Sequence, residues 1–187
     1  QKFPSVDEWL TLLSPAMIDV QHQVCSLGDN LLIQLRSAIQ LPAAFAWGYT
    51  FNIRIARLGI WARETGISDF RQRYWHSNTT TASIVLSEEW VFPIDPNTRS
   101  IAVELSNGRD IHKAVQTFMN TANFQPDAWV QIGHLKTDVR LSNIDETCAV
   151  AYANRVGEIF RDFLQNGVSD FHLFLAMPSS LAILVGQ

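Results

Sequence analysis

The run that decides the fold lies near the end of the chain and reads Asp170-Phe171-His172-Leu173-Phe174-Leu175-Ala176-Met177-Pro178-Ser179-Ser180-Leu181-Ala182. Its first seven residues are nearly all apolar, as is typical of a strand covered on both faces of a sheet. Pro178 fixes its own backbone torsion and is well suited to a helix start. Leu181 and Leu184 follow at helical spacing. This run predicts a buried strand, a tight turn and a last helix.

The residues before this run repeat the same order of elements. A strand is predicted over 100–105, and apolar residues at helical spacing predict a helix after Asn107. The next strand covers 129–132. A long helix follows, with Asn143 as its predicted N-cap and Gly167 at its end. Alternating strands and helices are typical of a parallel sheet with helical crossovers, so we predict an α/β fold.

The first half of the chain has weaker periodicity. A helix is predicted after Gly28, with apolar residues repeating on one face and Pro42 as its end. The segments 51–62 and 82–86 are strand candidates. We therefore expect the first half, up to residue 94, to form a second and diverged α/β lobe.

Composition limits the possible classes of function. Apolar residues make up 47% of the 187-residue chain, which is enough for a sizeable core. The formal net charge of −4 provides no general basic field, so direct binding of DNA or RNA is not expected. The two cysteines, Cys25 and Cys148, lack the spacing of a metal or redox site and favour a reduced interior. No apolar run is long enough to span a bilayer.

Sequence signatures of catalysis are absent. The chain contains no zinc-protease motif, no phosphate-cradling Gly-Lys-Ser loop and no nucleophile elbow. His112 with Cys148 or Asp110 is a conceivable nucleophilic pair, but nothing in the sequence selects it. The adjacent carboxylates Asp145 and Glu146 are interpreted as a solvated face. We therefore predict a binding domain with no catalytic residues and no metal site.

Candidate ligand residues follow the three predicted strands of the second half. Parallel sheets bind ligands at the carboxyl ends of their strands, where helix N-termini present free N–H groups. The junctions at 106–110, 133–138 and 177–180 should gather at that edge. The alternatives are solvated turns and, for the two serines, simple helix capping. The candidates at this edge are Asn107, Arg109, Lys136, Pro178, Ser179 and Ser180.

A basic and aromatic cluster forms a second group of candidates. Arg71, Arg73, Tyr74 and Trp75 combine cations with rings on which bases stack. The same composition suits a protein interface, and core packing is a further alternative for Trp75.

The run from Phe171 to Ala182, followed by Gly186, resembles the C-terminal signature of SAVED domains. The strand at 101–105, the helix after it and the long helix before Gly167 agree with this family in order and length. The resemblance implies two fused CARF-like (Rossmann-like) lobes, 1–94 and 95–187, with mainly parallel sheets flanked by helices.

The resemblance also implies a function. SAVED domains are sensors in bacterial anti-phage (CBASS) signalling, so we expect a cyclic di- or trinucleotide as ligand, no cofactor, self-association on binding and a cytoplasmic location. The chain begins with Gln1, and we expect an N-terminal effector, such as an HNH nuclease, to be attached to it. One alternative is a ring-nuclease-like enzyme in which Arg109, Lys136 and Ser179 act on a phosphodiester. The other is a protein-interaction module that uses the aromatic cluster.

Overall fold

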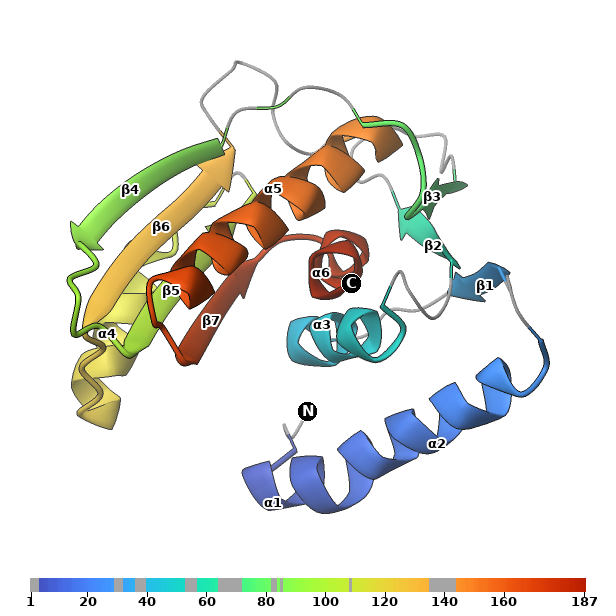
Figure 1. Ribbon diagram of the computed structural model, residues 1–187, viewed down its shortest axis with the longest axis horizontal. Helices are drawn as coiled ribbons and strands as arrows, with labels where there is room; N and C mark the ends of the chain where they lie inside the picture. The colour runs from blue at the N-terminus through green and yellow to red at the C-terminus, as the bar shows by residue number, and fades with distance from the viewer. Residues whose placement is uncertain are drawn as a thin grey trace.

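The computed structural model describes residues 4–28, 32–35, 40–52, 57–63, 72–81, 84, 86–107, 109–134 and 144–187. Helices and strands alternate from residue 100 onwards, whereas the described elements between residues 57 and 106 are all strands (Figure 1). In chain order the elements are α1 (Val6–Glu8), the π-helical segment η1 (Trp9–Leu13), α2 (Ser14–Cys25), β1 (Leu32–Leu35), α3 (Leu41–Thr50), β2 (Arg57–Arg63), β3 (Gln72–His76), β4 (Leu86–Phe92), β5 (Ser100–Ser106), α4 (His112–Ala122), β6 (Ala128–His134), α5 (Glu146–Gln165), β7 (Asp170–Ala176) and α6 (Ser179–Gly186).

A four-stranded sheet with the order β4-β6-β5-β7 forms the larger half of the fold. β5 runs parallel to both β6 and β7, while β4 is antiparallel to β6. Successive strand residues point to opposite faces, and each face has its own cover. Val115 and Met119 of α4 pack with Ala102 and Trp129 on one face. The buried residues of α5 and α6 pack on the other face with Val103 and its neighbours.

A three-stranded sheet, in the order β1-β2-β3, is formed by the first half of the chain. β1 and β2 are parallel, and β2 and β3 are antiparallel. The predicted α/β class is confirmed, with mixed sheets flanked by helices. β4 comes from the first half of the sequence and yet pairs with β6, so hydrogen bonds join the two halves. The division into two lobes stays a prediction.

The core is continuous across both sheets. A single cluster of buried side chains runs from Ala44 of α3 to Leu184 of α6. α6 is apolar all round and lies inside the molecule, as such helices do. It crosses α3 so closely that a Cβ on Gly48 would stand 1.9 Å from the carbonyl oxygen of Ile183. Within the described residues, no helix is long and apolar enough to cross a membrane.

The N-terminal helix stands apart from the sheets. The three helical segments α1, η1 and α2 contain no buried residue. α2 lies beside α3 (Figure 1), where the side-chain amide of Gln21 donates to the carbonyl oxygen of Thr50. This helix was not predicted, because its apolar residues are spread round its surface and η1 shifts their phase.

The helix predicted after Gly28 is wrong. Residues 32–35 form β1, which pairs in parallel with residues 57–60 of β2. Pro42 lies in the first turn of α3, which begins at Leu41, instead of ending a helix, because the first turn needs no N–H donor from that position.

The predicted N-cap of the long helix is also wrong. Asp145 caps α5, and its side chain accepts a hydrogen bond from the N–H of Cys148 at 2.8 Å. Asn143 lies outside the described residues. Gly167, with φ of +90°, follows the end of α5 as predicted, since glycine adopts this conformation without strain.

Candidate functional site

The carboxyl ends of β5, β6 and β7 meet at one edge of the sheet. Ser106 at the end of β5 is in register with both Gly133 and Ala176. The backbone N–H of Asn107 donates to the carbonyl oxygen of Ala176 at 2.9 Å, which extends the pairing one residue further. The hydroxyl of Tyr152 donates to the carbonyl oxygen of Ser106 at 3.3 Å and holds α5 against this edge.

The N-terminus of α6 lies at this edge without a side-chain cap. Pro178 occupies the N-cap position, and Ser179 and Ser180 are the first two residues of the helix. The serine hydroxyls therefore do not cap the helix, contrary to the alternative considered from the sequence. No side chain caps the first-turn N–H groups of α6, and the partial positive charge there favours an anion.

Asn107 places an unusual polar group beside this helix start. Its side chain is only 9% exposed, and neither its Nδ2 nor its Oδ1 has a hydrogen-bond partner. Most buried polar atoms in folded proteins are paired, because an unpaired one loses its bonds to water and gains none in return. The chain therefore provides no hydrogen-bond partner for the side-chain amide of Asn107.

The other two helix starts at the edge already hold carboxylates. Asp110 accepts a hydrogen bond from the N–H of His112 at 2.9 Å at the start of α4. Asp145 does the same for Cys148 at the start of α5, and this bond lowers the pKa of the Asp145 carboxyl. Negative charge at these two positions opposes an anionic ligand, so α6 is the helix best placed to bind one.

Glu146 ties the first half of the chain to this edge. Its Oε1 accepts hydrogen bonds from the backbone N–H of His76 at 2.7 Å and from the hydroxyl of Thr79 at 2.6 Å. The Nδ1 of His76 lies 3.0 Å from the same oxygen. Burial acts to raise the pKa of Glu146, but these hydrogen bonds outweigh it and the pKa is lowered. Glu146 is thus partly buried and structural, which the prediction of a solvated face missed, whereas Asp145 is exposed as predicted and also caps α5.

A comparison with protein families identifies the fold. The family model for the "SMODS-associated and fused to various effectors sensor domain", SAVED, matches residues 19–187. The chain belongs to the SAVED family. The proposed signature between Phe171 and Gly186 corresponds to β7, the turn with Pro178, and α6.

Solved structures with this fold include Cap4 receptors. The SAVED domain aligns with the Acinetobacter baumannii Cap4 SAVED/CARF-domain receptor bound to the cyclic trinucleotide 2'3'3'-cAAA, with a TM-score of 0.77 and 15% identity. The same receptor with 3'3'3'-cAAA gives a TM-score of 0.74 and 16% identity. Both alignments cover 98% of this chain and 39% of the receptor.

A Moraxella osloensis Cap4 receptor gives a TM-score of 0.67 at 14% identity, and the alignment covers 97% of this chain and 37% of that one. The SAVED domain therefore spans about two fifths of the length of these relatives. At such low identity the likeness shows the fold. No curated protein sequence matches this chain.

Four of the ten predicted ligand residues lie directly around the start of α6. Asn107, Pro178, Ser179 and Ser180 are brought together by the backbone bond between Asn107 and Ala176. Arg109 is exposed and follows two residues after Asn107. Lys136 lies outside the described residues.

The basic and aromatic cluster has a different placement. Arg73 and Tyr74 lie on β3, opposite Ala62 and Trp61 of β2. Trp75 is 3% exposed and belongs to the core, so a stacking role for its ring is wrong and core packing explains it. Arg71 lies outside the described residues. His76, the residue directly after the cluster, contacts Glu146 at the start of α5.

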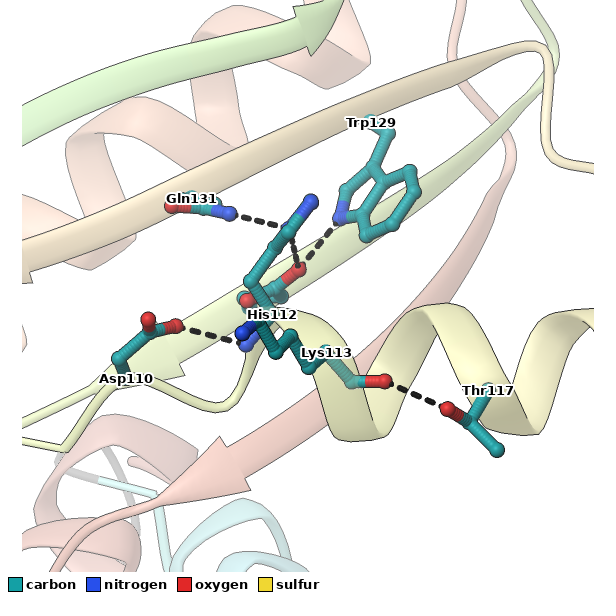
Figure 2. A network of polar contacts seen from close by, with 7 residues as sticks. Asp110, His112, Lys113, Thr117, Trp129 and Gln131 are labelled. Carbon is teal, nitrogen blue, oxygen red and sulfur yellow. Dashed lines mark hydrogen bonds and ion pairs between the residues drawn. The ribbon is translucent and has the colours of Figure 1, made fainter.

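A polar network that sequence reasoning missed lies on the face of the sheet covered by α4 (Figure 2). The carboxylate of Glu104 is 3% exposed and accepts a hydrogen bond from the indole N–H of Trp129 at 2.7 Å. His112 Nδ1 lies 3.1 Å from the same oxygen and also contacts the amide of Gln131. The rings of His112 and Trp129 stack at 4.7 Å. The one available signal was a carboxylate inside the apolar run 100–105.

This geometry does not support the nucleophilic pair. The His112 side chain contacts Glu104 and Gln131, and Asp110 bonds only to its backbone N–H. Burial, together with the neighbouring Asp145, raises the pKa of the Cys148 thiol, which disfavours the reactive thiolate. Among the described residues, no cluster of His, Cys, Asp and Glu is arranged to hold a metal ion.

An apolar cavity of about 750 Å³ lies between the N-terminal helix, α3 and β7. Its walls include Trp9, Phe45 and Tyr49, and they contain no basic side chain. Phosphate groups need N–H donors or cations, so this cavity is a poor match for a nucleotide ring. The edge with the open α6 start is the better candidate.

Proposed function

We propose that this SAVED domain is a sensor for a cyclic di- or trinucleotide, bound at the carboxyl edge of β5 and β7. The observation that carries the proposal is the uncapped start of α6 beside the unpaired amide of Asn107. Helix N-termini bind phosphate through their free N–H groups. Arg109 is close along the chain and supplies a guanidinium. The Acinetobacter baumannii Cap4 receptor, which shares this fold, was solved with two cyclic trinucleotides, which supports a ligand of this class.

Calorimetric titration with a panel of cyclic di- and trinucleotides tests this function. We expect one or more members of the panel to bind, and the absence of heat with every member would contradict the proposal. Chromatography after long incubation should return the ligand intact, because the domain is proposed to bind and not to cleave.

A charge substitution tests the position of the site. Ser179→Asp places a carboxylate in the first turn of α6, where it opposes phosphate but suits the helix itself. We expect binding to weaken by roughly tenfold or more while thermal stability is kept. Asn120→Asp adds the same charge at an exposed position on α4 and should leave affinity unchanged. Equal affinity in both variants would place the ligand elsewhere.

The same proposal extends to assembly and output. Ligand binding favours self-association if the assembled state binds the ligand more tightly. Relatives of this chain are longer, and we propose that the full protein is a cytoplasmic CBASS effector, for example a nuclease of the HNH type, switched on by this assembly. Analytical ultracentrifugation with and without ligand tests the assembly step, and an unchanged sedimentation coefficient on saturation would contradict it.

A further inference from the structure

β7 leaves one of its two edges unpaired. It is the last strand in the order β4-β6-β5-β7 and pairs with β5 alone among the described strands. Within the described residues, no backbone hydrogen bond reaches the other side of β7 between Phe171 and Leu175. A free strand edge presents N–H and C=O groups that pair readily with another strand. β7 contains no lysine or proline, the residues that commonly protect such an edge.

The apolar cavity lies beside this strand. Leu173 and Leu175 line it, and as alternate residues they point to the same face of the sheet. The cavity is also lined by α3, where Phe45 and Tyr49 lie one helical turn apart and share a side of the helix. Another side of α3 packs against α6 through Gly48. The side of α3 with Phe45 and Tyr49 therefore faces the cavity, and no residue that lines the cavity is charged.

Trp9 limits what fits into the cavity. It lies on η1, outside residues 19–187 that match the family model, and it lines the cavity together with α3 and β7. A second copy that paired through its own β7 would bring a sheet covered by helices on both faces against these walls. The cavity of about 750 Å³ therefore suits a single chain segment and excludes pairing of two sheets at this edge.

The chemistry of the walls selects the kind of segment. A small apolar molecule would fill the cavity but would leave the free N–H and C=O groups of β7 unpaired. A helix bonds its backbone groups internally and has none to give to β7. An extended peptide does both, because its main chain pairs with the strand edge and every second side chain enters the cavity. Its inward side chains are uncharged, since the walls hold no partner for an ion.

We propose that the cavity beside β7 holds the linker that precedes this domain in the full-length protein, bound as an extended strand along β7. This chain covers only 39% of the Cap4 receptor, so domains with this fold occur in longer proteins. Trp9 lies one turn after the start of the N-terminal helix (Figure 1), so the chain before this helix begins close to the cavity. Tethering gives such a segment an effective concentration of roughly millimolar, which a separate peptide lacks.

The linker strand would share β7 with the candidate ligand edge. β7 ends at Ala176, whose carbonyl oxygen accepts the backbone N–H of Asn107. One strand thus connects the edge proposed to bind the ligand with the segment proposed to lead to the effector. The inference goes beyond the proposed function, because docking of the linker does not depend on which ligand the edge binds.

Hydrogen exchange measured by mass spectrometry tests the docking. The 187-residue chain and the full-length protein are compared without ligand. We expect amides between residues 171 and 175 to exchange more slowly in the full-length protein, by roughly tenfold or more. Tyr49→Lys places a charge on the cavity wall at a side chain that is 73% exposed, so the fold tolerates it. In the full-length protein this variant should lose most of the slowing.

Leu164→Lys is the matched control. Leu164 is also exposed and also lies in the last turn of its helix, α5, but it does not line the cavity. This variant should keep the slow exchange of the full-length protein. Circular dichroism of both variants checks that the helices are retained.

Three results would overturn the inference. The first is equal exchange of β7 in the 187-residue chain and in the full-length protein. The second is slow exchange that Tyr49→Lys leaves unchanged, because the protection would then come from a contact outside the cavity. The third is slowing in the 187-residue chain alone as its concentration rises, which would assign the cavity to a second copy. No nucleotide is used, so each of these results leaves the proposed sensing function intact.

Discussion

The carboxylate of Glu104 shows how a buried charge on the sheet is stabilised by single residues around it. Glu104 lies in the middle of β5, is only 3% exposed and contacts His112 at the start of α4. Burying an unpaired carboxylate is costly, and this one is contacted by Trp129 of β6 and His112 of α4. Gln131 of β6 in turn contacts His112. The network joins the start of α4 to the sheet just below the candidate edge. The positions of these residues indicate a structural role for the network, and no catalytic step is needed to explain it.

Removing one donor from this network should be costly. Trp129→Phe keeps a ring against His112 but removes the N–H that donates to Glu104. We expect the free energy of unfolding to fall by about 1–3 kcal/mol, measured by urea denaturation. Trp90→Phe is the control, because that indole is partly exposed and meets Phe163 edge-on. An equal loss in both variants would show that the hydrogen bond is unimportant.

Glu146 should make stability depend on pH. Its pKa in the folded chain lies below the ordinary value of 4.5, so its contribution is present above about pH 4.5 and disappears as the pH falls through the lowered value. Glu146→Gln does not titrate. We therefore expect the variant to be less stable than the unaltered chain near about pH 7 and the difference to shrink towards about pH 3.5.

Urea unfolding at several pH values measures this difference. Glu158→Gln is the control on the same helix, since its exposed pair with Arg155 contributes little at either pH. A gap between Glu146→Gln and the unaltered chain that stays constant with pH would contradict the assignment.

Packing of whole elements depends on two glycines where α3 crosses α6. A Cβ at Gly48 or at Gly186 would overlap the backbone of the facing helix. A helix backbone cannot move away without disturbing the core around it. These glycines are therefore required by the close approach of the two helices, in spite of their low helix propensity.

Gly48→Ala should destabilise the fold by about 1–3 kcal/mol or more, as overpacking does. The clash is with backbone atoms, which leaves no flexible side chain to give way. A Cβ at Gly157 on α5 would meet only the Arg161 side chain, at 3.8 Å. Gly157→Ala should therefore stabilise by about 0.5–1 kcal/mol, because alanine is the better helix former. Thermal unfolding of the two variants provides the comparison, and the prediction fails if Gly48→Ala is as stable as the unaltered chain.

Elements of the second half could be predicted because their periodicity is strong. The strands near 100, 129 and 170 and the helices after them appear where the apolar pattern places them. The first half was misread where tertiary pairing overrides local pattern. Leu31, Leu35 and Ile39 have helical spacing in the sequence, but residues 32–35 pair in parallel with β2. β4 was placed too early, since its start at Leu86 depends on pairing with His134.

The candidate site was predictable in part for the same reason. The carboxyl ends of parallel strands meet at one edge, so Asn107 and the turn at Pro178 could be placed together without coordinates. Sequence alone could not show that the Asn107 amide is unpaired or that Trp75 is buried. Both facts depend on contacts between distant segments.

At the scale of the whole molecule, the N-terminal helix contributes least to the core. None of the residues in α1, η1 and α2 is buried, and the family match begins only at residue 19. We expect a chain starting at residue 19 to fold and to keep a cooperative thermal transition within a few degrees of the full one. Differential scanning calorimetry measures this. A truncated chain that melts without a cooperative transition would show that the helix is part of the folding unit.

The pairing of β4 with β6 has a practical consequence for building a reporter. A gene divided between residues 94 and 95 would produce two polypeptides that share one hydrophobic core. The first would carry β4 and the second would carry its hydrogen-bonded partner β6. Each piece alone would expose apolar surface, and the two together would bury it. If each polypeptide were fused to one half of a split luminescent enzyme, reassembly would produce luminescence. The luminescence would then report binding of a ligand at the carboxyl edge.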